Sequence, residues 1–542
     1  MLRIQQLNLE IPHFQTETEY DNYQKQQLEK KILKLLKIQS KDLKSFSIVR
    51  RSLDARKKPV LFYSYIVDVE VTGEQQIFQK CRQKNVSLVE NKEYQFPQIP
   101  KKEFKENSNR PVIIGLGPAG LFCGYYLAMQ GLNPIILERG KMVEERLKDV
   151  EEFWNTGVLN TESNVQFGEG GAGTFSDGKL NTLVKDKYGR NKEVLKVFVE
   201  NGASEKIIYD QKPHIGTDVL MNVVRNMRKK MVSLGAEIHY ETQMTEILQK
   251  NGKIIGVKTK DGQLFSTNTV VLAIGHSARD TFQMCHEQNI SMEAKPFAVG
   301  FRVEHPQKLI NFQQYGEDYP DCLPAAAYKV TAKSDLGRGV YSFCMCPGGY
   351  VVNASSEEGH LAINGMSYSK RDGKNANSAI IISVNPEDFC GQGPLSGVEF
   401  QRQIEKKAYK IGNGKIPVQY YKDFKGQSQH TNAIPTDFSP SMKGAYCFAR
   451  VSEILPKELN DSFIQGMEHF HKLLPGFGDD YALVSGIESR TSSPLRILRD
   501  ESGQSLALKG LYPCGEGAGY AGGITSAAMD GIYIAERIVL NY

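Results

Sequence analysis

The sequence predicts an α/β protein whose main domain, a parallel sheet flanked by helices, is made of two separate stretches of the chain. A β-rich insert is expected between the two stretches, and a small α/β module in front of them. A strand–glycine turn–helix–strand pattern occupies residues 111–138, a second strand–glycine turn–helix pattern occupies residues 511–539, and short strands separated by turn residues lie between them. The length of 542 residues also exceeds what one hydrophobic core accommodates.

Composition places the chain among globular proteins. Hydrophobic residues make up 40% and charged residues 24% of the sequence, which are ordinary proportions. No apolar run approaches the ~20 residues of a membrane span, and the first residues lack the apolar stretch of a signal peptide. We therefore expect a cytoplasmic protein with no membrane partner and no bound metal. Nine cysteines without a secretion signal predict reduced thiols rather than disulfides.

Residues 1–95 are predicted to form a small α/β module of the ferredoxin-like kind. A strand near Leu2–Leu9 is followed by a helix over about residues 19–37 and by two more strands, the second with alternating apolar positions between Leu61 and Val71. The loop predicted between these two strands carries Arg50, Arg51, Arg56, Lys57 and Lys58. This run favours a solvated hairpin end, and an anion-binding loop is the alternative.

The net charge of +5 is unevenly distributed along the chain. Residues 1–110 carry +7, and the remainder carries −2. Such asymmetry indicates either an acidic partner such as nucleic acid or, more commonly, a lysine-rich solvated surface. A polar linker with two prolines is predicted over residues 96–109.

Residues 111–138 carry a dinucleotide-binding βαβ fingerprint. Gly115 permits the tight turn, Gly117 lets a pyrophosphate approach the backbone, and Gly120 lets the helix pack closely on the strand. The helix N-terminus offers unpaired N–H groups and a positive dipole end to phosphates. Glu138 follows the second strand, about 20 residues after the last glycine, where an acid accepts hydrogen bonds from a ribose. Because all parts stand at this spacing, we expect a bound dinucleotide rather than a plain glycine-rich turn.

The remaining segments define the predicted domain organisation. A glycine cluster occupies residues 168–180, and residues 235–275 predict a strand, a three-stranded meander with turns at residues 251–252 and 261–262, and a final apolar strand. No second GxGxxG occurs in the insert. The predicted parts are the N-terminal module (1–95), the linker (96–109), the first part of the dinucleotide-binding domain (110–290), the insert (291–484) and the second part of that domain (485–542).

This layout resembles that of FAD-dependent enzymes of the glutathione-reductase-like superfamily. The resemblance covers residues 111–542 and implies a Rossmann-like, three-layer ββα FAD-binding domain with an inserted substrate domain. The segments VQFGEGGAGTFSDGKL, SFCMCPGGYVVNASSEEG, GIESRTSSPLRI and CGEGAGYAGGITSAAMDG are similar to those of a bacterial and plastid family described only as FAD-dependent dehydrogenases. The resemblance therefore implies FAD as the cofactor and no particular substrate.

The resemblance also implies which residues contact FAD. Gly515 and Glu516 occupy the closing turn for the ribityl chain, where many relatives have aspartate, one methylene shorter than Glu516. Residues 522–525 precede the last helix, whose N-terminus would face flavin N1 and the C2 carbonyl and stabilise reduced flavin. Residues 170–174 resemble a second flavin-contact turn, with a surface glycine loop as the alternative. The full set is Gly115, Gly117, Pro118, Ala119, Gly120, Glu138, Arg139, Gly170, Gly171, Gly173, Thr174, Gly275, Gly515, Glu516, Gly522, Gly523, Ile524 and Thr525.

Cys344 and Cys346 are the first candidates for chemistry. If they lie in a strand, both thiols project to one face and are close enough for a dithiol relay. Redox pairs more often use CxxC at a helix start, and buried strand cysteines commonly pack as small hydrophobes, as we expect for Cys514.

Several arginines and histidines are further candidates. Arg490, and with it Arg496 and Arg499, would either grip a substrate carboxylate or phosphate or tie the insert to the FAD domain by ion pairs. His305, in the segment GFRVEHP, is an acid–base candidate. A histidine before proline is more often structural, and His276 is a weaker candidate on the same grounds.

The sequence thus predicts an FAD-dependent oxidoreductase, a dehydrogenase or reductase with flavin-mediated hydride transfer to or from a small organic substrate between the FAD domain and the insert. Two alternatives stay open: a flavoprotein acting on RNA or another acidic macromolecule delivered by residues 1–100, and a non-catalytic FAD-binding protein. Since a second fingerprint is missing, NAD(P)H as electron donor would dock transiently at the flavin face. The oligomeric state stays open too.

Overall fold

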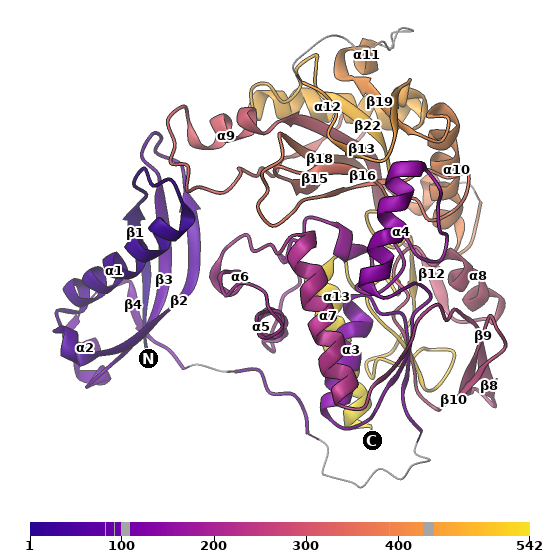
Figure 1. Ribbon diagram of the computed structural model, residues 1–542, viewed down its shortest axis with the longest axis horizontal. Coiled ribbons are helices and arrows are strands. Elements are labelled where there is room, and N and C mark those ends of the chain that lie inside the picture. Colours follow the sequence, from indigo (N-terminus) through magenta and orange to yellow (C-terminus); the bar gives the residue numbers. More distant parts are fainter. Residues whose placement is uncertain (82, 91–92, 99–108, 390, 427–437, 542) are drawn as a thin grey trace.

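The computed structural model describes residues 1–81, 83–90, 93–98, 109–389, 391–426 and 438–541. Figure 1 shows three parts: an N-terminal module at one side, a domain built from both the middle and the end of the chain, and an insert above that domain. Most of the predicted linker lies outside the described residues. The described helices include none that is long and apolar enough to cross a lipid bilayer.

The N-terminal module is a four-stranded antiparallel sheet with two helices. Its strand order is β2-β3-β1-β4, which with the βαββαβ chain order is the predicted ferredoxin-like arrangement. Leu28 and Ile32 of the first helix are buried against the sheet. The elements are β1 (Leu2–Glu10), α1 (Glu17–Leu36), the short 3₁₀ turn η1 (Ser40–Asp42), β2 (Leu43–Asp54), β3 (Phe62–Val71), α2 (Glu74–Cys81) and β4 (Val86–Leu88).

The basic segment of this module differs from the prediction. Strand β2 continues to Asp54, so Arg50 and Arg51 lie in the strand and not in a loop. Arg51 is buried, and its guanidinium donates two hydrogen bonds to Asp210, at 2.6 and 2.9 Å. Its charge therefore attaches the module to the main domain and is not available to an anionic ligand.

The main domain contains a five-stranded parallel sheet of order β24-β11-β5-β6-β7. The last strand in the chain pairs with β11, so the sheet is completed by the C-terminal segment, as predicted for a discontinuous domain. The central strands β5 and β11 are entirely apolar and buried on both faces, which is typical of parallel sheets. The strands are β5 (Val112–Ile114), β6 (Ile135–Leu137), β7 (Glu237–His239), β11 (Val270–Leu272) and β24 (Leu511–Pro513).

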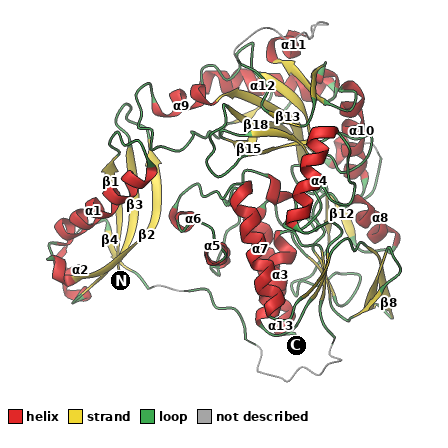
Figure 2. Ribbon diagram, in the orientation of Figure 1, coloured by secondary structure: helices red, strands yellow, loops and turns green. Residues whose placement is uncertain are grey.

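Two different layers cover this sheet. Ile113 and Val271 pack into the core formed with the helices, whereas Val112 and Leu272 pack into the core formed with a three-stranded meander. Figure 2 shows α3, α7 and α13 side by side in the helical layer. The meander is β8 (Met244–Lys250), β9 (Lys253–Thr259) and β10 (Leu264–Ser266); the helices are α3 (Pro118–Met129), α4 (Val143–Thr156), α5 (Arg190–Glu200), α6 (Lys206–Tyr209), α7 (Thr217–Ser233), α8 (Arg279–Glu287) and α13 (Ile524–Leu540), with the 3₁₀ turn η2 (Ala172–Phe175).

The insert is built on a seven-stranded sheet of order β14-β15-β18-β13-β22-β19-β21, accompanied by a small sheet of order β17-β16-β20. Strand β22 (Leu483–Glu488) crosses the predicted end of the insert at residue 484, so this sheet extends further along the chain than expected. The other elements are β13 (Phe297–Pro306), α9 (Gln307–Tyr315), β14 (Thr331–Lys333), β15 (Gly339–Cys346), β16 (Tyr350–Asn353), β17 (Ile363–Met366), β18 (Asn375–Val384), η3 (Pro386–Asp388), α10 (Ser396–Ile411), β19 (Ile416–Tyr420), α11 (Tyr421–Gly426), β20 (Met442–Lys443), β21 (Tyr446–Phe448), η4 (Val451–Glu453) and α12 (Lys457–Leu473).

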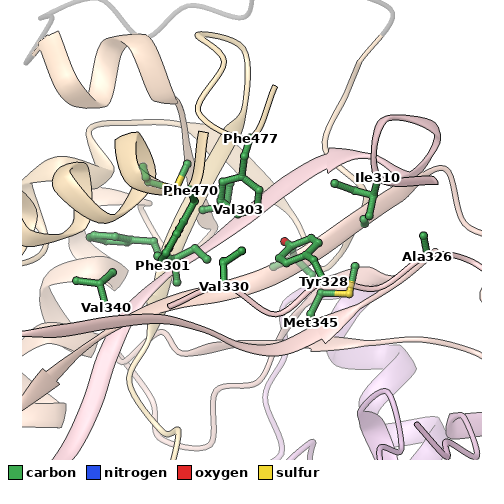
Figure 3. Packing of buried hydrophobic residues seen from close by; sticks show 14 of the residues in the cluster. Phe301, Val303, Ile310, Ala326, Tyr328, Val330, Val340, Met345, Phe470 and Phe477 are labelled. Carbon is green, nitrogen blue, oxygen red and sulfur yellow. The ribbon is translucent and has the colours of Figure 1, made fainter. Parts of the chain in front are cut away.

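The insert has its own aromatic core. Figure 3 shows Phe470 and Phe477 meeting Phe301 and Val303 of β13 between the sheet and the helices. A short antiparallel pair, β12 (Met292–Ala294) with β23 (Leu495–Ile497), joins the chain entering the insert to the chain leaving it. This pair and β22 fix the insert against the carboxyl ends of the parallel strands, where ligands of such sheets bind.

Candidate functional site

A cavity of about 310 Å³ lies between the carboxyl ends of the parallel strands and the insert. It contains residues from every glycine motif singled out in the sequence. The predicted cofactor-binding residues that line it are Gly115, Gly117, Pro118, Ala119, Glu138, Arg139, Gly171, Gly173, Gly275, Glu516, Gly522, Gly523 and Ile524.

Five predicted positions do not line the cavity but lie behind its wall. A Cβ at Gly120 would overlap the Gly115 carbonyl oxygen, so this glycine sets the packing of α3 on the turn. Gly515 donates its N–H to Asp530 at 2.7 Å, and Thr525 donates its hydroxyl to the Leu180 carbonyl at 2.9 Å. Helix α13 begins at Ile524, two residues earlier than expected, so Thr525 lies inside the helix. The other two positions are Gly170 and Thr174.

The first glycine turn forms a cradle beneath the N-terminus of α3. Gly115 has a φ of 94°, and a Cβ there would lie 2.6 Å from the Ala273 carbonyl oxygen. Gly117 is the N-cap of α3 and faces Gly171, where a Cβ would lie 2.9 Å from the Gly117 Cα. Two glycine turns thus meet at a helix N-terminus that opens on the cavity, which fits a diphosphate.

Glu138 connects the first glycine turn to the backbone turns beside it. Its buried carboxylate accepts hydrogen bonds from the N–H groups of Leu116 at 2.7 Å, Gly140 at 2.9 Å and Gly168 at 3.0 Å. Since a carboxylate offers about four lone-pair sites, these bonds leave capacity for a ribose hydroxyl. Arg139 is different, because its guanidinium bonds Glu162 and Asp280, so it acts mainly as a structural tie.

Glu516 presents a carboxylate to the cavity. Among the described residues it has no hydrogen-bond donor, and burial raises its pKa to about 7 against the opposing effect of the Lys295 charge. An unpartnered polar group at this place fits the hydroxyls of a ribityl chain. Beside it, a Cβ at Gly522 or Gly523 would meet only open space, so the backbone that precedes α13 faces the cavity directly.

The wall that the insert contributes is organised around Arg302. This arginine is fully buried and donates to Glu488 at 2.6 and 3.2 Å, to Asn377 at 2.7 Å and to Asn364 at 3.1 Å. Glu488 and Asn364 line the cavity. Burial raises the pKa of Glu488 to about 7, although the Arg302 charge opposes the rise.

Cys344 and Cys346 lie in the same wall, but not in a regular strand. Cys344 has a φ of 42°, and the pairing of β15 with β18 shifts between Phe343 and Cys346. Simple alternation therefore does not describe this segment. Cys344 lines the cavity, whereas Cys346 is buried behind it, with its thiol donating to the Cys344 carbonyl at 3.2 Å.

His305, the weak acid–base candidate, lies in the structural setting that the sequence favoured for it. Its ring bonds the Phe477 carbonyl through Nε2 at 2.6 Å and lies against the Phe477 ring in the core of the insert. Burial lowers its pKa to about 4, so the ring is neutral. His276 does line the cavity, but burial and the charges of Arg490 and Arg279 lower its pKa to about 3.

Arg490 lies at the cavity wall but its guanidinium is already bonded. It donates to both oxygens of Glu405, at 2.9 and 2.8 Å, and to Ser356 at 2.5 Å. Arg499 is likewise paired with Asp530, at 2.9 and 2.6 Å, and Arg496 lies 3.7 Å from Glu293. These contacts favour a structural role for the three arginines, as ion pairs between parts of the fold, over a role in binding a substrate anion.

Replacing Glu304 by glutamine is expected to flatten part of the pH dependence of stability. Glu304 neighbours Arg302 in sequence and accepts the Ser441 N–H, and burial raises its pKa from 4.5 to about 8. Between these values the unfolded chain releases the proton while the folded protein keeps it. The contribution of Glu304 to the free energy of unfolding is therefore fully present below about pH 4.5. As the pH rises above this value, the contribution falls by up to ~1.4 kcal/mol per pH unit until the pH passes the pKa of the folded protein.

Melting temperatures measured across this pH range check the expectation. Wild type should lose more stability on going to alkaline pH than Glu304→Gln, while the exposed Glu387→Gln should follow wild type. Parallel curves for wild type and Glu304→Gln would show that the buried carboxyl is ionised in the folded protein.

Comparisons with known proteins agree with this arrangement. Residues 296–491 match the family model "FAD-dependent protein, C-terminal domain-like", and residues 1–70 match the model of a domain of unknown function. An uncharacterized protein from Clostridium beijerinckii is 46% identical over 519 residues, which cover 95% of this chain and 96% of the relative.

Solved structures with similar folds are much more distant. The flavin-dependent brominase Bmp2 matches with a TM-score of 0.36 and 13% identity over 80% of both chains. The glycerol-3-phosphate dehydrogenase from Bacillus halodurans, solved with FAD, matches with a TM-score of 0.35 and 12% identity, over 80% of this chain and 64% of that chain.

Proposed function

Since the chain belongs to the same family as the Clostridium beijerinckii protein and its residues 296–491 match the FAD-dependent family model, we propose that it is an FAD-dependent oxidoreductase acting on a small organic substrate between the parallel-sheet domain and the insert. One observation carries the proposal. The glycine turn before α3, the glycines before α13 and a polar wall of the insert all line one cavity.

The residues present fit the cofactor along the whole cavity. The turn at Gly115 and Gly117 with the N-terminus of α3 would hold the diphosphate, Glu138 the adenosine ribose, and Glu516 the ribityl chain. The N-terminus of α13 would favour negative charge on the flavin ring. When bound, FAD supplies two-electron redox chemistry.

The insert would supply the groups that act on the substrate. Glu488 lines the cavity with a pKa near 7, so its carboxyl can hold or release a proton at physiological pH. Arg302 bonds both oxygens of that carboxyl, which fixes its orientation. Phe343 and Asn364 complete the wall with an apolar face and an amide. The arrangement suits a substrate that gains or loses a proton when it is reduced or oxidised.

The purified protein is expected to be yellow, with flavin absorbance near ~450 nm, and to be bleached anaerobically by a reductant that fits the cavity. NADH, NADPH, small amines and thiols form the first panel. The absence of flavin even after FAD is added would contradict the proposal. Bound flavin without turnover with oxygen, a quinone or a dye as acceptor would instead point to a non-catalytic role.

Replacing Glu488 by glutamine is expected to lower turnover per bound flavin by about a hundredfold, the usual scale of general acid–base catalysis. Flavin content and the absorbance spectrum should stay close to wild type, because Glu488 lies on the insert and not in the glycine turns. Glu304→Gln is the matched control, since that carboxyl is buried on the same sheet but does not line the cavity. Equal turnover of the two variants would exclude the proton-transfer role.

A further inference from the structure

We propose that Cys344 and Cys346 form a redox-active dithiol that exchanges with a thiol or disulfide substrate in the cavity. The inference rests on the proposed function, since it names the substrate class of the same site. Position and charge give the two thiols different roles, and the backbone allows them to form a disulfide.

Position is the first distinction between the two thiols. Cys344 lines the cavity and is reachable by a small molecule, whereas Cys346 is fully buried behind it. The Cys346 thiol donates to the Cys344 carbonyl at 3.2 Å, and the interaction between the two thiols shifts their pKa values in opposite directions. An accessible thiol in contact with a buried one is the arrangement of an attacking and a resolving cysteine.

Charge is the second distinction. Arg302 donates an N–H to the Cys344 carbonyl at 3.0 Å and lies 3.8 Å from the Cys346 sulfur. The hydrogen bond from Cys346 and the charges of Arg302 and Lys179 lower the pKa of Cys344, whereas burial raises that of Cys346. The thiolate is the reactive form of cysteine, so negative charge collects on the thiol that faces the cavity.

The backbone allows the two sulfurs to be joined. Alternate Cα atoms of a regular strand lie about 6.6 Å apart, close to the upper limit of ~6.8 Å for a disulfide. Cys344 departs from the regular strand, with its φ of 42° at the shift in register. The φ of Cys344 governs the distance between Phe343 and Met345 and not that between the two cysteines, so it is the i, i+2 spacing itself that permits the bridge.

The exchange balances without any further reagent. The Cys344 thiolate attacks one sulfur of a substrate disulfide, the substrate S–S bond breaks, and the departing thiolate takes up a proton. The Cys346 thiol then loses its proton and attacks the Cys344 sulfur, forming the Cys344–Cys346 bond and releasing the second substrate thiol. The pair is oxidised by two electrons and the substrate disulfide is reduced to two thiols. A dithiol substrate runs the same steps in reverse.

Oxidised glutathione serves as the probe on the full-length protein as purified. After incubation the free thiols are alkylated, and intact-mass and peptide analysis count and locate those that were protected. Wild type is expected to lose two reactive thiols per chain, which map to Cys344 and Cys346 and return with dithiothreitol. Cys346→Ser should instead keep one glutathione on Cys344, and Cys344→Ser should keep none.

Cys447→Ser is the matched control, since Cys447 is only half-buried but does not line the cavity; it should behave as wild type. Melting temperature and flavin absorbance verify that each variant is folded. If a variant does not fold, the peptide map of wild type alone still shows whether Cys344 and Cys346 form a disulfide. Wild type that keeps both thiols, or equal glutathione uptake by Cys344→Ser and Cys346→Ser, would overturn the proposal.

The pH profile of alkylation gives a readout that mere accessibility would not produce. In Cys346→Ser the rate of Cys344 alkylation by iodoacetamide should change by less than about threefold between about pH 7 and about pH 9, whereas a thiol with an ordinary pKa near ~8.5 speeds up about twentyfold. These thiol measurements do not depend on the flavin. A disulfide in a protein that binds no flavin would contradict the proposed oxidoreductase alone, and a flavoprotein without the disulfide would contradict the dithiol alone.

Discussion

Replacing Gly120 by alanine is expected to reduce FAD affinity by about tenfold to a hundredfold. Gly120 lies in the first turn of α3, and its missing side chain is what allows the helix to contact the preceding turn. A Cβ at this position would overlap the Gly115 carbonyl oxygen, which is backbone and has no alternative rotamer. The helix must therefore move away, and its N-terminal N–H groups move with it from the cradle beside Gly117.

The size of the effect follows from the cost of overpacking. Forcing one extra carbon into a well-packed site costs about 1–3 kcal/mol, and ~1.4 kcal/mol corresponds to a tenfold change in affinity. The flavin-to-protein ratio after purification and titration of the apoprotein with FAD measure it. Gly426→Ala is the matched control, because no atom of the described residues lies within 4 Å of a Cβ there. Unchanged FAD affinity in Gly120→Ala would show that α3 does not support the cofactor.

Features that depend on local backbone conformation could be predicted from the sequence. The turns at Asn251-Gly252 and Asp261-Gly262 connect the three strands of the meander as expected. At the first turn both residues have positive φ, the conformation that an Asn-Gly pair favours in a hairpin. The same holds for Gly115, whose positive φ is a property of the turn itself. The apolar parallel strands and the return of the C-terminal segment to the sheet were predictable for a similar reason, because each is marked by a short run of apolar residues or glycines in the sequence.

Buried ionic contacts between distant segments left no such pattern. Arg302 and Glu488 are 186 residues apart and meet only because β13 and β22 are neighbours in the insert. Arg146 is fully buried in α4 and donates hydrogen bonds to backbone carbonyls between Asn164 and Gly171, so it shapes the loop behind the second glycine cluster. Its spacing places it on the inner face of α4 with Val143 and Val150, but the spacing does not say which carbonyls it bonds. The structural reading of His305 was the favoured one, but its partner Phe477 could not be named for the same reason, since it comes from a distant segment.

Replacing Glu405 by glutamine is expected to destabilise the junction between the insert and the parallel-sheet domain by about 3–5 kcal/mol. Glu405 of α10 is fully buried and accepts hydrogen bonds from Arg279 at 2.7 and 2.9 Å and from Arg490 at 2.9 and 2.8 Å. Both guanidinium charges hold the pKa of this carboxyl well below its ordinary value despite burial. Arg279 retains Glu357 as a second partner, so the greater loss falls on Arg490.

The pH dependence gives this prediction its sharpest form. A carboxyl whose pKa is lowered on folding contributes stability above its unfolded pKa of 4.5, and that stability is lost as the pH falls through and below this value. Wild type should therefore be more stable than Glu405→Gln near neutral pH, and the two melting curves should converge on acidification. The exposed Glu399→Gln, on the same helix, should match wild type throughout. A constant difference between wild type and Glu405→Gln at all pH values would mean that packing, and not the charge shared by two arginines, joins the insert to the domain that carries the glycine turns.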